Sequence, residues 1–324
     1  MLSRREVLFG GMTGGALLLR RTLAVMAKAP QPRTKINFEA PTGACDCHVH
    51  VFGDPQRFAF SPTRVYTPET ASLDELRALH VALHIGRVVV VQPSVYGTDN
   101  ACTIDAIRQL GNRARGVAVI DDKTPDAALD EMGRVGVRGI RLNLATAGIT
   151  DPAAARQRFR AAAERVKTRN WHIQFNTELR MIGAMNDALL ASPVPLVFDH
   201  FGGAIAAQGV QQPGFDALVK LVKNGKAYVK ISASGDGMST RGPGYADVAP
   251  FAKMLIAANP QRVLWGTNWP HPDSARVPGR KNTDIAPLQQ TDDGRIMNLL
   301  QTWAPDSVTR RMILVENPAR LYGF

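Results

Sequence analysis

The chain has 324 residues, 45% of them hydrophobic, and is therefore long enough to form one large barrel or two ordinary domains around a substantial core. Its formal net charge is +11, but the basic residues are scattered without a run of five or a nucleic-acid-binding motif, which favours a binder of small anions over a binder of nucleic acid. The three cysteines match neither a zinc-ribbon pattern nor a disulfide framework.

Residues 1–29 are typical of an export signal. The pair Arg4-Arg5 precedes a short, glycine-containing apolar stretch, as in bacterial twin-arginine (Tat) signals. This pattern predicts a periplasmic protein without stable membrane insertion, because the stretch is too short to span a bilayer. The alternative is a cytoplasmic protein with an uncleaved N-terminus. Residues 30–43 contain several prolines and are expected to be a linker, so that the folded domain covers residues 44–324.

The first predicted strand reads ACDCHVHVF and covers residues 44–52. Side chains alternate between the two faces of a strand, so Asp46, His48 and His50 share one face while Cys45 and Cys47 lie on the other. Burying unpartnered polar groups costs free energy, so an ionisable face indicates the wall of a site. The alternative is that both histidines are hydrogen-bonded core residues.

Regular alternation follows a long irregular segment, residues 53–70, which is expected to cover the site through Arg64 and Tyr66. Helical stretches alternate with apolar runs at residues 87–94, 114–121, 137–143, 172–177, 195–203, 227–234 and 262–270. With the opening strand this gives eight strand-and-helix units, which predict an α/β fold, a single (β/α)8 barrel. A doubly wound sheet is the competing fold, but no Gly-x-Gly-x-x-Gly sequence follows the first strand.

Polar residues concentrate at the carboxyl ends of the predicted strands, where the active sites of such barrels lie. The candidates in chain order are His48, His50, Gln92, Ser94, Arg138, Arg141, Asn143, Gln174, Asn176, Glu178, Asp199, His200, Lys230, Ser232, Ser234, Asn268 and His271. By contrast, His80 and His84 lie one turn apart on a helix of the outer ring and lack the intervening Glu of a zinc-binding helix, so no site is assigned to them.

Five motifs in order, DCHVHVFG, VQPSVYGTDN, VRGIRLN, FDHFGG and WGTNWPHP, resemble those of amidohydrolase-related TIM barrels of the 2-pyrone-4,6-dicarboxylate lactonase type. The resemblance runs from Asp46 to the C-terminal ENPARLYGF. It implies a hydrolase that opens a lactone ring, with His48, His50 and His200 around the reacting carbonyl. Substrate carboxylates would be held by side chains among Arg138, Arg141, Ser94 and Tyr66, and we add Asn143, Asn176 and His271 as further candidates for substrate binding.

Two positions depart from the lactonase pattern. Asn268 stands where the lactonases have the Asp that is thought to activate water, and an amide cannot accept a proton. Gly237 stands where they have an Arg, for which Arg241 is a candidate substitute. With Asn268 among the catalytic candidates, the general base would be Asp46, His200 or Glu178, and the sequence does not choose among them.

A divalent metal, Zn or Mn, is arguable because His48, His50 and His200 offer three nitrogen ligands and an open position for water. The lactonases that the chain resembles work without a metal. The predicted function is hydrolysis of a small carboxylated or sugar-acid lactone. Alternatives in the same barrel are a lactone isomerase, a non-oxidative decarboxylase, or a periplasmic binding protein that has lost its base, for which Asn268→Asp would restore hydrolysis.

Overall fold

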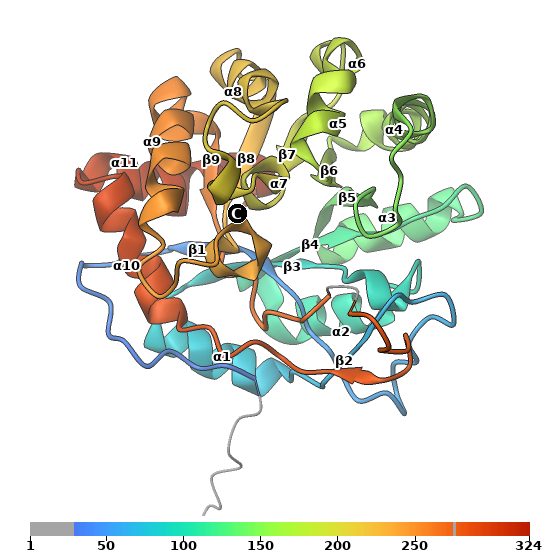
Figure 1. Ribbon diagram of the computed structural model, residues 1–324. Helices are drawn as coiled ribbons and strands as arrows, with labels where there is room; N and C mark the ends of the chain where they lie inside the picture. Colours follow the sequence, from blue (N-terminus) through green and yellow to red (C-terminus); the bar gives the residue numbers. More distant parts are fainter. Residues whose placement is uncertain (1–28, 275–276) are drawn as a thin grey trace, which may run out of the picture.

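Eight parallel strands form the centre of the protein and are surrounded by helices (Figure 1). The computed structural model describes residues 29–274 and 277–324. The barrel strands, hydrogen-bonded in this order, are β1 (Cys45–Val49), β3 (Arg87–Val91), β4 (Ala114–Ala118), β5 (Val137–Asn143), β6 (His172–Asn176), β7 (Leu196–Phe198), β8 (Ala227–Ile231) and β9 (Val263–Trp265). The predicted (β/α)8 barrel is thereby confirmed, and the doubly wound alternative is wrong.

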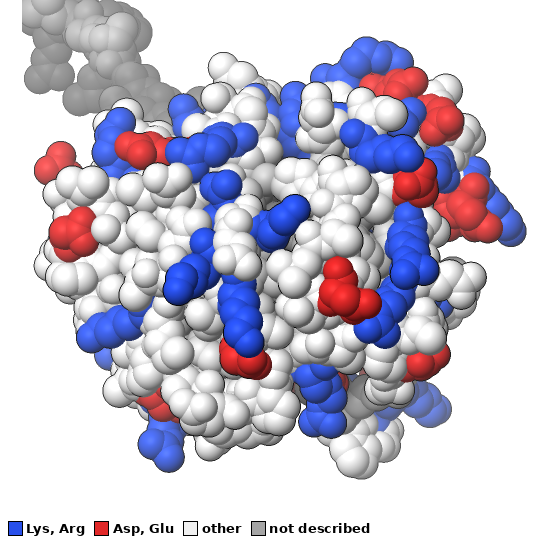
Figure 2. Space-filling model, turned by 90° about the horizontal axis from the view of Figure 1, so that it is seen from above, with Lys and Arg blue, Asp and Glu red and all other residues white. Residues whose placement is uncertain are grey.

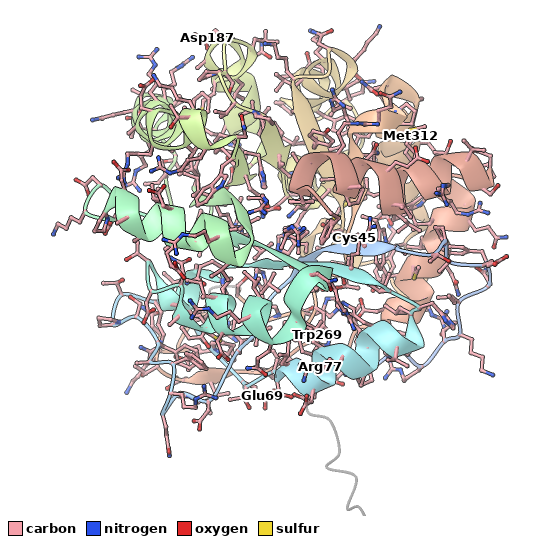
Figure 3. All side chains as sticks on the ribbon, turned by 180° about the vertical axis from the view of Figure 1, so that it is seen from behind. Cys45, Glu69, Arg77, Asp187, Trp269 and Met312 are labelled. Atoms are coloured by element: carbon pink, nitrogen blue, oxygen red, sulfur yellow. The ribbon has the colours of Figure 1, made fainter. Side chains whose placement is uncertain are left out.

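The strands are buried because their side chains are apolar on both faces. In β3, Val88 to Val91 are all completely buried, and Cys45 of β1 (labelled in Figure 3) and Cys47 belong to the apolar cluster inside the barrel. The pairing of β1 with β3 has a register shift between Asp46 and Val49, so His48 also faces the interior, at Asp199, whereas Asp46 faces His80 outside the barrel. The predicted common face of Asp46, His48 and His50 is therefore wrong for Asp46. A strand covered on both sides is stable only when helices occupy the outer face, and the crossover connections of parallel strands provide them.

Most helices lie between successive barrel strands, as expected, and the last three follow β9. They are α1 (Leu73–Ala82), α2 (Ala101–Leu110), α3 (Asp126–Val135), α4 (Pro152–Val166), α5 (Leu179–Ala184), α6 (Asn186–Leu190), α7 (His200–Gly203), α8 (Phe215–Lys223), α9 (Ala249–Ala258), α10 (Asp293–Trp303), α11 (Ser307–Arg311) and α12 (Asn317–Tyr322). Ser72 and Glu75 form a capping box at the start of α1, and Asp151 caps α4. Between β6 and β7 the helical stretch over residues 179–190 is two helices with a break at Met185.

The barrel is closed between its first and last strands by the segment after β9. The backbone N–H of His50 donates to the carbonyl of Trp269 at 2.8 Å, and the N–H of Asn268 donates to the carbonyl of His48 at 2.9 Å. Asp46 accepts from the N–H and the hydroxyl of Thr267. These bonds hold the strand-eight motif directly against the His-x-His strand.

Two very short strands join the segments that follow β1 and β9. β2 (Thr67–Pro68), in the irregular segment after β1, pairs in parallel with β10 (Ile285–Ala286), in the segment after β9. The hydroxyl of Thr67 donates to the carbonyl of Asn282, and the N–H of Leu288 donates to Glu69. The two-residue strands of this β2–β10 pair are too short to give a sequence signal.

Residues 30–43, expected as a linker, contain no helix or strand but are packed onto the barrel. Trp269 donates from its indole to the carbonyl of Pro30, and Asp292 accepts from the backbone of Arg33 and from both the backbone and the hydroxyl of Thr34. The segment is therefore part of the folded domain, in contrast to the flexible spacer that was expected. The predicted Tat signal lies outside the described residues, apart from Ala29.

Charge on the described surface agrees with the scattered pattern of the sequence. On the face shown in Figure 2, Lys and Arg side chains are interspersed with Asp, Glu and uncharged surface. Among the described residues, none of the helices has both the length and the hydrophobicity needed to cross a bilayer.

Candidate active site

A cavity of about 480 Å³ opens at the carboxyl ends of the barrel strands, the end expected to carry chemistry. Its walls come from strand ends and from the loops that follow them. They are His50, Val65, Tyr66, Pro93, Ser94, Arg141, Ala145, Thr146, Asn176, His200, Asp236, Gly237, Asn268, Pro272, Asp273, Ser274 and Gln289. Seven of these had been candidates in the sequence: His50, Tyr66, Ser94, Arg141, Asn176, His200 and Asn268.

The two histidines of the first strand form a directed chain of hydrogen bonds. His50 Nδ1 lies 2.8 Å from the carbonyl of Val91, so it carries a proton and leaves Nε2 as an acceptor. His48 Nε2 lies 3.3 Å from that atom and Lys230 Nζ lies 3.2 Å from His48 Nδ1. With His48 protonated on Nε2, each group donates to the next, from Lys230 through both imidazoles to Val91. Burial lowers the pKa of His50 to about 3, helped by Arg141, and keeps His48 neutral too.

Asp199 gathers cationic and amide donors at the floor of the site. Its Oδ2 accepts from Arg141 Nε at 2.9 Å and from Gln174 Nε2 at 3.1 Å, while Oδ1 lies 3.1 Å from His48 Nδ1 and 3.4 Å from Lys230 Nζ. Burial alone would raise the pKa of Asp199, but the neighbouring cations Lys230 and Arg141 outweigh burial and hold it well below its ordinary value. The carboxylate is therefore ionised, and both oxygens are engaged.

Arg141 connects this floor to the cavity. Its Nε is held by Asp199, and among the described residues its two terminal nitrogens donate to none. A guanidinium that is fixed at Nε and open at both terminal nitrogens can bind a carboxylate through two parallel hydrogen bonds. Tyr66 and Ser94 line the same cavity, and burial raises the pKa of Tyr66 to about 12, so its hydroxyl keeps its proton.

His200 enters the cavity from a run of left-handed backbone after β7. Residues 200–203 all have positive φ, from +49° at His200 to +79° at Gly203, where an added Cβ would lie 2.2 Å from the carbonyl oxygen of Thr177. Asn268 and His271 also have positive φ, and strained backbone of this kind gathers at functional sites. His200 Nδ1 lies 2.9 Å from Ser232 Oγ, and burial lowers the pKa of His200 to about 4.

A second group of ionisable side chains stands on the wall formed by the segments after β8 and β9. Asp236 Oδ2 accepts from Asn268 Nδ2 at 2.8 Å and lies 2.6 Å from His271 Nδ1. On its other side His271 Nε2 lies 3.1 Å from both oxygens of the fully buried Asp293. Burial would lower the pKa of His271, but the two carboxylates raise it well above its ordinary value, so the imidazole is charged.

Several sequence-predicted residues lie elsewhere. Arg138, at the opposite end of β5, donates to the carbonyls of Gly133 and Val137, and Arg241 is exposed and does not line the cavity; both expectations of substrate binding are wrong. Asn143 does not line the cavity either, and His271 lies behind Asp236. His48 is completely buried beneath His50 and His200, with its ring centre 4.5 Å from that of His200.

The candidate bases also separate. Asp46 is fully buried and engaged by Thr267 and the backbone of His48, and Glu178 is 61% exposed and lines other surface hollows, so neither reaches the cavity. Gln174 and Lys230 were candidates at strand ends without an assigned role, whereas Asp236 and Asp293 were not candidates. A lysine inside the apolar run AYVKISAS was a signal for Lys230, whereas no local pattern marks Asp236 or Asp293.

Whether the site suits a divalent metal depends on which of its possible ligand atoms are already engaged by other groups. His48, Asp199 and His200 bring ligand atoms within 4.8 Å of one another. Asp199, however, already accepts from Arg141 and Gln174 and forms an ion pair with Lys230, and the nitrogens of His48 and His50 are used in the directed chain. Two buried cations also face one carboxylate, so a divalent ion would add uncompensated charge. The residues do not fit a metal, and no chemical step is assigned to one.

Comparison with known proteins gives consistent matches over nearly the whole chain. Residues 45–324 match the Amidohydro_2 family of amidohydrolases. The chain is 34% identical to a 2-pyrone-4,6-dicarboxylate hydrolase of Comamonas testosteroni (89% of this chain, 93% of the relative) and 33% identical to a 4-sulfomuconolactone hydrolase of Hydrogenophaga intermedia (94% and 97%). It is 29% identical to a D-galactarolactone isomerase of Agrobacterium fabrum (87% and 91%). An apo structure from Agrobacterium tumefaciens superposes with a TM-score of 0.75 at 26% identity, covering 90% of this chain and 98% of the other.

Proposed function

The chain belongs to the Amidohydro_2 family of amidohydrolases, and from this premise we propose that it is an enzyme that hydrolyses a small carboxylated lactone. The observation that carries the proposal is Arg141, whose fixed guanidinium presents two free nitrogens inside a cavity that is also lined by His200. A volume of about 480 Å³ is in the range of cavities that bind small molecules and accommodates one small ring.

Binding and activation are assigned to different walls of the cavity. Arg141, with the hydroxyls of Tyr66 and Ser94, would hold a substrate carboxylate and orient the ring. When Ser232 donates to His200 Nδ1, the His200 proton lies on Nε2, from which it would donate to the lactone carbonyl oxygen and stabilise the oxyanion. The lowered pKa of His200 supports this role, because a neutral imidazole can act as a donor without carrying a charge into the site.

A second candidate function, lactone isomerisation, is favoured by Asn268. A carboxamide at this position resembles the sugar-acid lactone isomerases, one of which is among the relatives of the chain. In an isomerase a hydroxyl of the substrate attacks the ester carbonyl in place of water, and both reactions can use the same carboxylate grip and oxyanion donor.

The test is a panel of purified lactones with and without carboxylates, followed by acid release at constant pH and by product analysis in water enriched in heavy oxygen. A hydrolase releases acid and incorporates one solvent oxygen, whereas an isomerase does neither. We expect carboxylated lactones to react at least tenfold faster in kcat/KM than neutral ones of the same ring size. Failure to convert any lactone of the panel would refute the proposal.

We also propose that the protein acts in the periplasm after Tat export. The support is the Arg4-Arg5 pair and the apolar stretch after it, residues that lie outside the described structure. Cell fractionation of the full chain should place it in the periplasm, and changing Arg4 and Arg5 to lysine should retain it in the cytoplasm. An unchanged distribution would contradict export by this route.

A further inference from the structure

We propose that Asp236 is the general base of this enzyme, supplied by the segment after β8 because Asn268 cannot accept a proton. The inference rests on the proposed lactone hydrolysis and goes beyond it by assigning the group that activates water. It starts from a substitution visible in the sequence, a carboxamide in the strand-eight motif, and from a carboxylate that the fold brings into hydrogen-bond contact with that carboxamide.

One oxygen of Asp236 is left without a partner inside the site. Asp236 lines the cavity, its side chain is only 7% exposed, and its Oδ1 is buried with no hydrogen-bond partner among the described residues. An unsatisfied buried carboxylate oxygen is costly, so it indicates an atom that a ligand or water is meant to meet. The other oxygen, Oδ2, makes the contacts with Asn268 and His271.

The contacts at Oδ2 fix the direction of Oδ1. Asn268 Nδ2 donates to Oδ2 at 2.8 Å, and the backbone N–H of Asn268 is itself bound to the carbonyl of His48. The carboxylate is therefore positioned relative to the His-x-His strand through one residue. The π-helical turn Ser234–Met238 carries Asp236, and Tyr245 packs so tightly against this turn that a Cβ on Gly235 would lie 2.5 Å from its hydroxyl. A larger residue at position 235 would have to displace the Tyr245 side chain.

His271 and Asp293 are positioning residues behind the base. His271 bridges Asp236 Oδ2 and both oxygens of Asp293, so a buried carboxylate, an imidazolium and a second carboxylate stand in line. Burial works to raise the pKa of Asp236, but His271 and the hydrogen bonds from His271 and Asn268 outweigh it and lower the pKa below its ordinary value. Asp236 is therefore ionised at neutral pH. The other titratable groups that act on it are His200 and Tyr245.

In the proposed hydrolysis Asp236 first accepts a proton and later returns it. Asp236 Oδ1 takes a proton from a water molecule while the water oxygen forms a bond to the lactone carbonyl carbon, and the carbonyl electron pair moves onto its oxygen. When the tetrahedral intermediate collapses, the bond between the acyl carbon and the ring oxygen breaks. Its electron pair goes to the ring oxygen, which receives the proton from Asp236. The product is the ring-opened hydroxy acid, and Asp236 is regenerated as a carboxylate.

The same contact explains why a carboxylate at position 268 would be harmful. In Asn268→Asp two carboxylates would face each other at the present 2.8 Å, and like charges at that distance cannot both be ionised easily. The structure thus predicts a loss of activity for this variant, which is the opposite of what an enzyme that merely lacks its base would show. An exchange of the two side chains should restore a carboxylate and an amide in contact.

The test measures kcat and KM of the full chain on a lactone that the wild type hydrolyses. We expect Asp236→Asn to lower kcat by about 10²- to 10⁴-fold with KM changed less than threefold, and Asn268→Asp to lower kcat at least tenfold. The double variant Asp236→Asn/Asn268→Asp should exceed Asp236→Asn at least tenfold. Asp216→Asn, whose side chain is 74% exposed on α8, is the matched control and should match the wild type.

Two further measurements separate chemistry from folding. Thermal unfolding and circular dichroism verify that each variant is folded, and added formate should raise the rate of Asp236→Ala at least tenfold by replacing the lost carboxylate. For the positioning role, His271→Gln should move the acidic limb of the pH profile of kcat to higher pH. Without the imidazolium of His271 beside it, Asp236 has a higher pKa.

An active wild type with a folded Asp236→Asn variant of unchanged kcat would overturn the assignment of the base and leave the proposed function standing. A gain of activity in Asn268→Asp would overturn it as well. A wild type that hydrolyses no lactone would overturn the proposed function, and the assignment of the base with it.

Discussion

Replacement of Lys230 by methionine tests the buried electrostatic floor of the site. Lys230 is completely buried, donates to Gln174 Oε1 at 2.7 Å and to His48 Nδ1 at 3.2 Å, and lies 3.4 Å from Asp199 Oδ1. Methionine keeps most of the volume of the aliphatic stem, so the substitution removes the charge and its hydrogen bonds without opening a large cavity.

The expected cost follows from the partners that are left behind. Removing one member of a buried ion pair costs about 3–5 kcal/mol, because the remaining charge stays in a low-dielectric interior. Arg141 still compensates Asp199, but the carbonyl of Gln174 and Nδ1 of His48 lose their donor. With an unfolding entropy of about 2.1 cal/mol/K per residue, this cost corresponds to a fall in Tm of roughly 4–7 °C for a chain of this size.

The assay is thermal unfolding by circular dichroism with urea titration as a second measure. Lys220→Met is the matched control, since Lys220 is 68% exposed and pairs only with Asp216 at the surface, where an ion pair contributes little. We expect Lys220→Met to unfold within about 1 °C of the wild type. If Lys230→Met were no less stable than this control, the argument that Lys230 organises Asp199 and His48 would be refuted.

Three further predictions concern the same site. Arg141→Lys should raise KM for a carboxylated lactone by about 10- to 100-fold while sparing a neutral lactone, because a lysine cannot form two parallel hydrogen bonds; equal effects on both would contradict the carboxylate grip. Activity should survive dialysis against a chelator, with bound metal well below one equivalent by elemental analysis; loss restored only by zinc or manganese would contradict the donor argument. The pKa of Asp199 in the folded protein lies below its unfolded value of about 3.9. Its contribution to the free energy of unfolding is therefore complete above that value and is lost as the pH falls through the folded pKa. Urea unfolding from pH 5 to 2 should show this loss, and the loss should be weaker in Asp199→Asn.

The barrel and the first strand of the site could be predicted because both leave a local pattern. Apolar runs alternate with helical stretches, and the His-x-His strand places two imidazoles on one face by simple alternation. Arg138 and Arg141 show where this reasoning stops. Both belong to the same strand and resemble the same motif, but they lie at opposite ends of β5, and the sequence does not show where along a strand the cavity begins.

Residues whose role depends on distant partners could not be found in this way. Asp236 becomes a candidate base only through Asn268 and His271, which are more than thirty positions away, and Asp293 only through His271. Residues 30–43 were misjudged for a different reason. Prolines predict irregular backbone, but irregular backbone can still be hydrogen-bonded to the domain, as the bonds of Pro30 and Thr34 show.

The β2–β10 pair has a consequence for how substrate choice can change. The groups assigned to chemistry belong to barrel strands and to the turns immediately after them. Val65 and Gln289, by contrast, line the cavity and lie close in sequence to the β2–β10 pair. Exchanging the segments around Thr67–Pro68 and Ile285–Ala286 would therefore reshape the entrance of the cavity while leaving the reacting groups in place. Such chimeras offer a route to new ring sizes, provided both segments are exchanged together, because each strand has the other as its pairing partner.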